Sequence, residues 1–277
     1  MPKRYLLLGV ALLLAVGCTE AKPAGQGGTA PVMESGKVVT ISIESKALGS
    51  TRKVNVYLPG GYEQSTERYP VVYLFRGHER EWVNPKEDGS RGGRTAATIA
   101  DELVQSRAIP PLILVMPGLA TDDNRIPGLG INFAMPELVT EEPTVGPGRF
   151  EDYMMQEVIP AVDAQFRTIA DRQHRGADGF SLGGFTALSL ALRFPEQFSS
   201  VGAFDGTFFY AGGIRPDGSH DSLLDISMLR PAFGDPINQD LFRRVNPADL
   251  VDQIPLEQLK RLTFHIHSGP EAQEPQA

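Results

Sequence analysis

The stretch that decides the fold is GADGFSLGGFTALSLALRFP, residues 176–195. Its pattern predicts the end of a strand, a sharp turn around Ser181, and an apolar helix closed by Pro195. Gly179 and Gly183 flank the serine and permit a tight, strained turn that lifts the hydroxyl clear of the backbone. At the start of the helix, the N–H of Leu182 is placed to stabilise an oxyanion, so the segment predicts acyl-transfer chemistry at Ser181.

The G-x-S-x-G match alone is weak evidence, because 29 of the 277 residues are glycine. The plain alternative is a serine in a glycine-rich turn. The context favours the nucleophile, since strand, turn and buried helix follow in the order that the mechanism needs.

Composition limits the classes of protein. A chain of 277 residues with 41% hydrophobic residues is long enough for one α/β domain with a sizeable core. A net charge of −8 without a basic patch argues against a nucleic-acid partner. We find no phosphate loop and no dinucleotide motif, and no third ligand accompanies His265 and His267 at metal-binding spacing. No cofactor and no metal are therefore expected.

The N-terminus has the layout of a secretory signal, with Lys3 and Arg4 before an apolar run over 5–16. Residues 14–18, LAVGC, resemble a bacterial lipobox, which predicts a lipid anchor on Cys18 in the cell envelope. The alternative is an ordinary signal peptide with an incidental cysteine. Cys18 is the only cysteine, so no disulfide forms within the chain. We expect a signal over 1–18, a flexible tether over 19–36 and a folded domain over 37–277.

The rest of the chain reads as alternating strands and helices. An opening hairpin is expected from near Lys37, with VVTISIES (38–45) and RKVNVYLP (52–59) as its strands around a turn at 48–50. Residues 95–106 have the pattern of a helix. Residues 150–166 predict a helix that Pro160 kinks. The connection 117–148 is long enough to be a loop or lid near the site, with a disordered insertion as the alternative, and 207–260 predicts a loop with short helices. Continuous apolar runs predict buried strands over 69–75 and 112–116, and further strands are expected over 198–204 and 262–267.

Four segments in order, YPVVYLFRGH, EDYMMQEVIPAVDAQFRT, GFSLGGFTALSLALRFPEQFSSVGAFDG and TFHIHSG, resemble the esterase family of α/β-hydrolases that includes esterase D, feruloyl esterases, siderophore esterases and mycolyltransferases. The resemblance implies an α/β-hydrolase fold, with a mostly parallel sheet and helices on both faces, and hydrolysis of a small-molecule ester through an acyl-serine. By position, Ser181 matches the nucleophile, and Leu182 and His78 supply the oxyanion N–H groups. Arg76 departs from the family, which often has histidine there; as the alternative, Arg76 and His78 are solvated loop residues.

The same resemblance places the catalytic acid after the strand 262–267, where Glu271 is the candidate and Glu274 a substitute. Asp205, after the strand 198–204, is the second possibility. A histidine should follow the acid, yet none follows either glutamate, and none of the five histidines stands in the expected order. We therefore expect a serine esterase with the C-terminal part of the fold missing before the catalytic histidine. The alternatives are a non-catalytic binding module of the same fold and an acyltransferase. The identity of the ester and the oligomeric state stay open.

Overall fold

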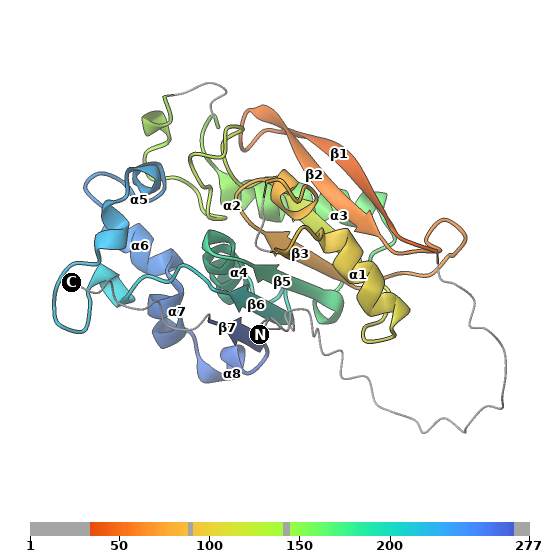
Figure 1. The fold of residues 1–277 in the computed structure, drawn as a ribbon. Helices are drawn as coiled ribbons and strands as arrows, with labels where there is room; N and C mark the ends of the chain where they lie inside the picture. The colour runs from red at the N-terminus through yellow and green to blue at the C-terminus, as the bar shows by residue number, and fades with distance from the viewer. Residues whose placement is uncertain (1–33, 88–90, 141–144, 269–277) are drawn as a thin grey trace, which may run out of the picture.

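A computed structural model describes residues 34–87, 91–140 and 145–268. They form one seven-stranded sheet in the order β1-β2-β4-β3-β5-β6-β7 (Figure 1). β1 and β2 form the predicted hairpin, β2 runs antiparallel to β4, and the five strands from β4 to β7 are parallel. The predicted mostly parallel sheet is confirmed. The strands are β1 Lys37–Ser45, β2 Ser50–Leu58, β3 Val71–Phe75, β4 Ile113–Pro117, β5 Arg175–Gly179, β6 Ser200–Phe204 and β7 Thr263–His267.

The central strands β3 and β4 lie inside the sheet because their sequences are continuously apolar. Every residue of β3 and of β4 is buried, as expected for parallel strands covered on both faces. The hairpin turn that precedes β2 uses Gly49 at φ +62°, in the left-handed region that favours glycine. Because β2 runs antiparallel to β4, the turn between β1 and β2 lies at the same edge of the sheet at which β3, β4 and β5 end.

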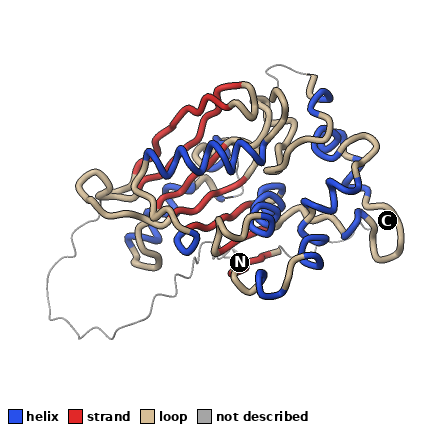
Figure 2. Tube along the Cα trace, turned by 180° about the vertical axis from the view of Figure 1, so that it is seen from behind, coloured by secondary structure: helices blue, strands red, loops and turns tan. Residues whose placement is uncertain are grey.

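Helices cover both faces of the sheet. α1, Ala96–Gln105, begins at the cap Thr95 and packs Ala100 and Val104 on one face. The opposite face carries α4, Leu182–Arg193, together with the segment that ends in α3 (Figures 1 and 2). Ten of the twelve residues of α4 are buried, which explains why its sequence is apolar nearly all round.

The predicted kinked helix is divided into three pieces. α2, Phe150–Asp152, leads into a π-helix, Tyr153–Val158, and then α3, Ile159–Gln165. The Ile159 N–H donates to the Met154 carbonyl, five residues back, so the departure from α-helical geometry lies before Pro160. Of the apolar residues spaced four apart in this segment, Met154, Val158 and Val162 are fully buried, and Phe166 is partly buried against the core.

Two long connections flank the carboxyl edge of the parallel strands. Of the first, the described residues 118–140 and 145–149 are irregular apart from a short 3-10 helix, Pro136–Leu138, and they bury Leu129, Ile131 and Phe133 in the core. In the second, Phe209 and Phe233 meet Phe185 of α4 in edge-to-face contacts, and Phe242 packs edge-to-face against Phe209 and Phe233. Its helices are α5 Arg230–Phe233, α6 Gln239–Val245, α7 Pro247–Gln253 and α8 Leu256–Leu259, as predicted for 207–260. Among the described residues, no helix has the length and apolar character to cross a membrane.

Candidate active site

Ser181 stands on the predicted turn between β5 and α4, with φ 56° and ψ −123°. This backbone conformation is strained for a residue with a side chain. The neighbouring glycines make it possible. A Cβ on Gly179 would lie 2.1 Å from the Gly183 carbonyl oxygen, and a Cβ on Gly183 would lie 2.0 Å from the Phe75 carbonyl oxygen. The sequence Gly-x-Ser-x-Gly is therefore required by close backbone packing at this point.

The backbone of Ser181 is held by strand β6 and the residues after it. Its N–H donates to the Phe204 carbonyl at 3.2 Å, and its carbonyl accepts from the Thr207 N–H at 3.0 Å. Its Oγ lies 3.4 Å from Thr207 Oγ1. Sequence reasoning did not find Thr207, because the contact depends on the pairing of distant strands. Among the described residues, no histidine hydrogen-bonds Ser181 Oγ.

The two predicted oxyanion donors differ in their surroundings. Leu182 is the first residue of α4, and within the described chain its N–H has no hydrogen-bond partner. His78 is 4% exposed, so it is not a solvated loop residue. Its N–H donates to Glu81 Oε2 at 2.5 Å. The role of His78 in the oxyanion hole stays a prediction, and in this conformation its N–H is already in use.

Arg76 connects the loop after β3 to the nucleophile turn. Its guanidinium stacks on the Phe180 ring at 4.1 Å, and its Nε lies 3.3 Å from Glu81 Oε1. The side chains of Arg76 and Glu81 are 16% and 12% exposed, so Arg76 too is no solvated loop residue. Phe180 in turn stacks on Phe204, with 5.7 Å between ring centroids. The residue that departs from the family pattern thus touches the residue before the predicted nucleophile.

Of the three predicted acids, only Asp205 lies within the described residues. Glu271, Glu274 and the predicted lipidation residue Cys18 lie outside the described ranges. Asp205 follows β6 with φ 48°, and its N–H donates to the His267 carbonyl at 2.7 Å.

Asp178, in β5 just before the turn, is a carboxylate that sequence reasoning missed. Its side chain faces Gly202 of β6, where any Cβ would clash with the carboxyl group. Burial raises the pKa of Asp178 to about 7, although the Gly179 N–H donates to it at 2.7 Å.

In the described structure, the hydrogen-bond and ion-pair partners of the histidines do not include Ser181 Oγ. His78 Nδ1 lies 2.6 Å from Glu79 Oε2. Burial works against ionisation of Glu79, yet its hydrogen bond with His78 and the charge there hold its pKa below the usual range. His174 and His220 pair with nearby aspartates, while His265 and His267 lie on the edge strand β7. No group of three or more metal-ligating side chains gathers in the part of the chain that the structure describes.

A cavity of about 350 Å³ lies where the two long connections meet. Its walls include Ile126, Leu138 and Met228 beside the turn at 121–124. That turn approaches the predicted oxyanion loop, since a Cβ on Gly77 would lie 2.3 Å from Asn124 Oδ1. The turn that lines the cavity thus packs against the loop that carries His78, although, among the described residues, neither that loop nor the nucleophile turn contributes a lining residue.

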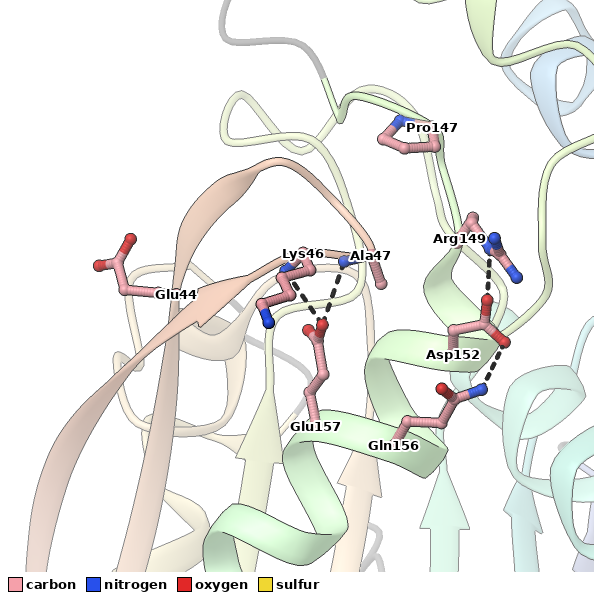
Figure 3. A pocket seen from close by; sticks show the side chains of 8 residues that line it. All are labelled: Glu44, Lys46, Ala47, Pro147, Arg149, Asp152, Gln156 and Glu157. Atoms are coloured by element: carbon pink, nitrogen blue, oxygen red, sulfur yellow. Dashed lines mark hydrogen bonds and ion pairs between the residues drawn. The ribbon is translucent and has the colours of Figure 1, made fainter.

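A larger polar cavity, of about 560 Å³, lies beside the turn between β1 and β2 (Figure 3). Charged side chains line it, and Arg149 pairs with Asp152 while Glu157 accepts from the backbone of the hairpin turn. No residue of the nucleophile turn or of the loop after β3 contributes to it.

Comparisons with known proteins agree with this geometry. The family model described as "Putative esterase" matches residues 45–269. An endo-1,4-beta-xylanase/feruloyl esterase of Xylanibacter ruminicola is 32% identical over 184 residues, which are 65% of this chain and 23% of the relative. An esterase of Mycobacterium tuberculosis is 30% identical over 166 residues, or 59% of this chain and 31% of the relative. The chain thus spans less than a third of the length of these relatives.

Solved structures show the same fold. A ferulic acid esterase has a TM-score of 0.56 at 21% identity, covering 85% of this chain and 91% of that one. An S-formylglutathione hydrolase of Agrobacterium tumefaciens has a TM-score of 0.57 at 20% identity, covering 85% and 88%. The predicted α/β-hydrolase fold is confirmed. Because the family model matches most of its length and the fold agrees, the chain belongs to the esterase family of α/β-hydrolases.

Proposed function

We propose that this chain is a serine carboxylic-ester hydrolase that works through an acyl-serine intermediate on Ser181. The observation that carries the proposal is the backbone of Ser181, at φ 56° and ψ −123° between β5 and a buried helix. A strained conformation costs on the order of 1–3 kcal/mol and persists where the surrounding structure enforces it. Here Gly179 and Gly183 leave room for the close backbone contacts around this conformation.

In the proposed reaction, Ser181 Oγ attacks the ester carbonyl carbon and its proton passes to a general base. The carbonyl electrons move onto oxygen, which accepts the Leu182 N–H at the positive end of the α4 dipole. Collapse of this intermediate breaks the bond to the alcohol, which leaves with the proton. Water then attacks the acyl-serine by the same steps, releasing the acid and restoring Ser181. The mechanism requires a base, and the predicted acid partner remains Glu271.

The relatives suggest the substrate class. Feruloyl and ferulic acid esterases occur among the similar proteins, so we propose carboxylic esters, with aromatic acyl groups among them. The apolar part of the cavity between the two connections, at Ile126, Leu138 and Met228, provides a surface on which such a group packs.

A second candidate function is a binding module that retains the hydrolase fold. Two observations favour it: no histidine hydrogen-bonds Ser181 Oγ in the described structure, and the His78 N–H is held by Glu81. A module of this kind would bind esters without rapid turnover.

Hydrolysis assays separate the two candidates. Residues 19–277 and the Ser181→Ala variant are compared on p-nitrophenyl acetate, p-nitrophenyl butyrate and methyl ferulate. The esterase proposal expects turnover that Ser181→Ala lowers by about 10³-fold or more. A folded wild-type protein that binds methyl ferulate but hydrolyses none of the three esters would favour the binding module.

We also propose that the mature protein is held in the cell envelope by a lipid on Cys18. The lipobox-like residues 14–18 and the tether composition of 19–36 support this localisation.

A further inference from the structure

The loop after β3 places a carboxylate on the predicted second oxyanion donor. In the sequence His78-Glu-Arg-Glu81, the histidine caps a 3-10 helix, Glu79–Trp82, and Glu81 reaches back to it. Glu81 Oε2 accepts the His78 N–H at 2.5 Å, the reciprocal bond of a capping box. A hydrogen bond from an amide to a charged acceptor is stronger than one to a neutral acceptor, so a neutral ester carbonyl does not displace it readily.

Other contacts fix the carboxylate in this position. Its Oε1 lies 3.3 Å from Arg76 Nε, and Arg91 donates to the carbonyl oxygen of Glu81. The Arg76 guanidinium rests on Phe180, directly before the nucleophile. Gly77 makes the approach possible, because a Cβ there would lie 3.1 Å from Glu81 Oε2. The carboxylate is thus anchored between the oxyanion loop and the nucleophile turn.

We propose that Glu81 governs the oxyanion hole of this chain by occupying its second donor, the His78 N–H. This inference rests on the proposed function. While the carboxylate is in place, Leu182 alone stabilises the oxyanion. The loss of one of two donors slows any reaction in which negative charge develops on an oxygen bound by these donors. Glu81 is a positioning residue here, since it acts through the His78 N–H and does not touch the reacting atoms.

The test combines one spectroscopic and one kinetic measurement on wild type, Glu81→Gln and Glu81→Ala. The control is Glu87→Gln, which removes the same charge from a partly exposed ion pair with Arg80 in the same segment. In ¹H–¹⁵N spectra, the His78 amide proton of the wild type should resonate far downfield. It should move upfield in both Glu81 variants and stay in place in Glu87→Gln.

The kinetic arm is the rate at which a fluorophosphonate labels Ser181. In this reaction the Oγ–P bond forms, the P–F bond breaks, and fluoride and the hydroxyl proton leave, while the phosphoryl oxygen occupies the oxyanion hole. One oxyanion donor is worth about 10²–10³-fold in rate, so Glu81→Ala should be labelled at least about tenfold faster than wild type. Glu81→Gln should follow in the same direction, and because it keeps the side-chain shape it separates the charge from any loss of packing.

The outcomes distinguish the inference from the proposed function. The role of Glu81 would be overturned if the His78 amide chemical shift did not change in the Glu81 variants. It would also be overturned if wild type were labelled and the labelling rates of Glu81→Ala and Glu81→Gln lay within twofold of the wild-type rate. Faster labelling of both variants with an upfield amide supports it. Absence of labelling in all four folded proteins would instead overturn the proposed function, and the role of Glu81 with it.

Discussion

Gly183 leaves no space for a methyl group, because its Cβ would meet the backbone of Phe75 at 2.0 Å from the oxygen and 2.5 Å from the carbon. Backbone atoms of a central strand do not move aside cheaply. We expect Gly183→Ala to lower the free energy of unfolding by about 3 kcal/mol or more. Gly61→Ala is the control: Gly61 has φ +78° with nothing within 4 Å, so it should lose only about 1–2 kcal/mol. Urea unfolding of the two variants measures the difference, and equal losses would argue against the packing at Gly183.

Asp178 gives the chain a specific dependence of stability on pH. Burial raises its pKa to about 7 in the folded protein, against about 3.9 in an unfolded chain. Between these values the folded state binds the extra proton, so the free energy of unfolding falls as pH rises from about 4 to about 7. Asp178→Asn should remove this fall in the free energy of unfolding, because an amide side chain does not ionise.

Urea unfolding of wild type and Asp178→Asn at pH 4, 5.5 and 8 tests that dependence. The variant should gain stability relative to wild type as pH rises, by a few kcal/mol in total. Parallel stability curves for the two proteins would show that Asp178 ionises normally in the folded state.

Among the elements, the π-helix Tyr153–Val158 holds the turn between β1 and β2 through Glu157. Glu157 Oε1 accepts the N–H groups of Lys46 and Ala47 at 3.0 and 3.1 Å (Figure 3). Glu157→Ala should cost about 1–3 kcal/mol, since two backbone donors lose their acceptor. Glu157→Gln keeps the acceptor oxygen and should lose less than half as much. Gln156→Ala, on an exposed neighbour, should stay within about 0.5 kcal/mol of wild type; a loss as large as that of Glu157→Ala would point to the helix itself.

The strands and α1 could be predicted because their sequences show clear patterns of apolar residues and of a helix cap. β3 and β4 are continuous apolar runs, and Thr95 caps α1 with its side chain. The π-helix could not, because apolar residues spaced four apart are compatible with both α- and π-helical hydrogen bonding. Only the bond from the Ile159 N–H to Met154 distinguishes the two, and it leaves no pattern in the sequence.

The candidate site was predictable where it is local. Ser181 and Leu182 follow from one short motif, whereas the capping box of His78 and Glu81 has a histidine where the sequence signature has Ser or Thr, so sequence reasoning did not find Glu81. The contacts of Ser181 with Thr207 and of Arg76 with Phe180 depend on how β3, β5 and β6 pair. Residues brought together in this way are separated by tens to more than a hundred positions, and no local pattern links them.

For the whole molecule, the lipobox-like sequence predicts attachment at Cys18. Expressed in a bacterium with lipoprotein processing, the full chain should incorporate radiolabelled palmitate and sediment with membranes. Cys18→Ser should lose the label and be recovered in the soluble fraction, because no other cysteine is available for thioether lipidation. Unchanged membrane recovery of unlabelled Cys18→Ser would indicate attachment by another route.

The proposed function depends on Ser181 as the nucleophile. The experiment is intact-mass and peptide mass spectrometry of residues 19–277 after treatment with a fluorophosphonate, with Ser181→Ala and Ser189→Ala compared. Ser189 is a buried serine two turns further along α4 that donates to the Val245 carbonyl. We predict a single adduct on the peptide that contains Ser181, lost in Ser181→Ala and retained in Ser189→Ala. A folded wild-type protein without an adduct, or an adduct that persists in Ser181→Ala, would show that Ser181 is not the nucleophile.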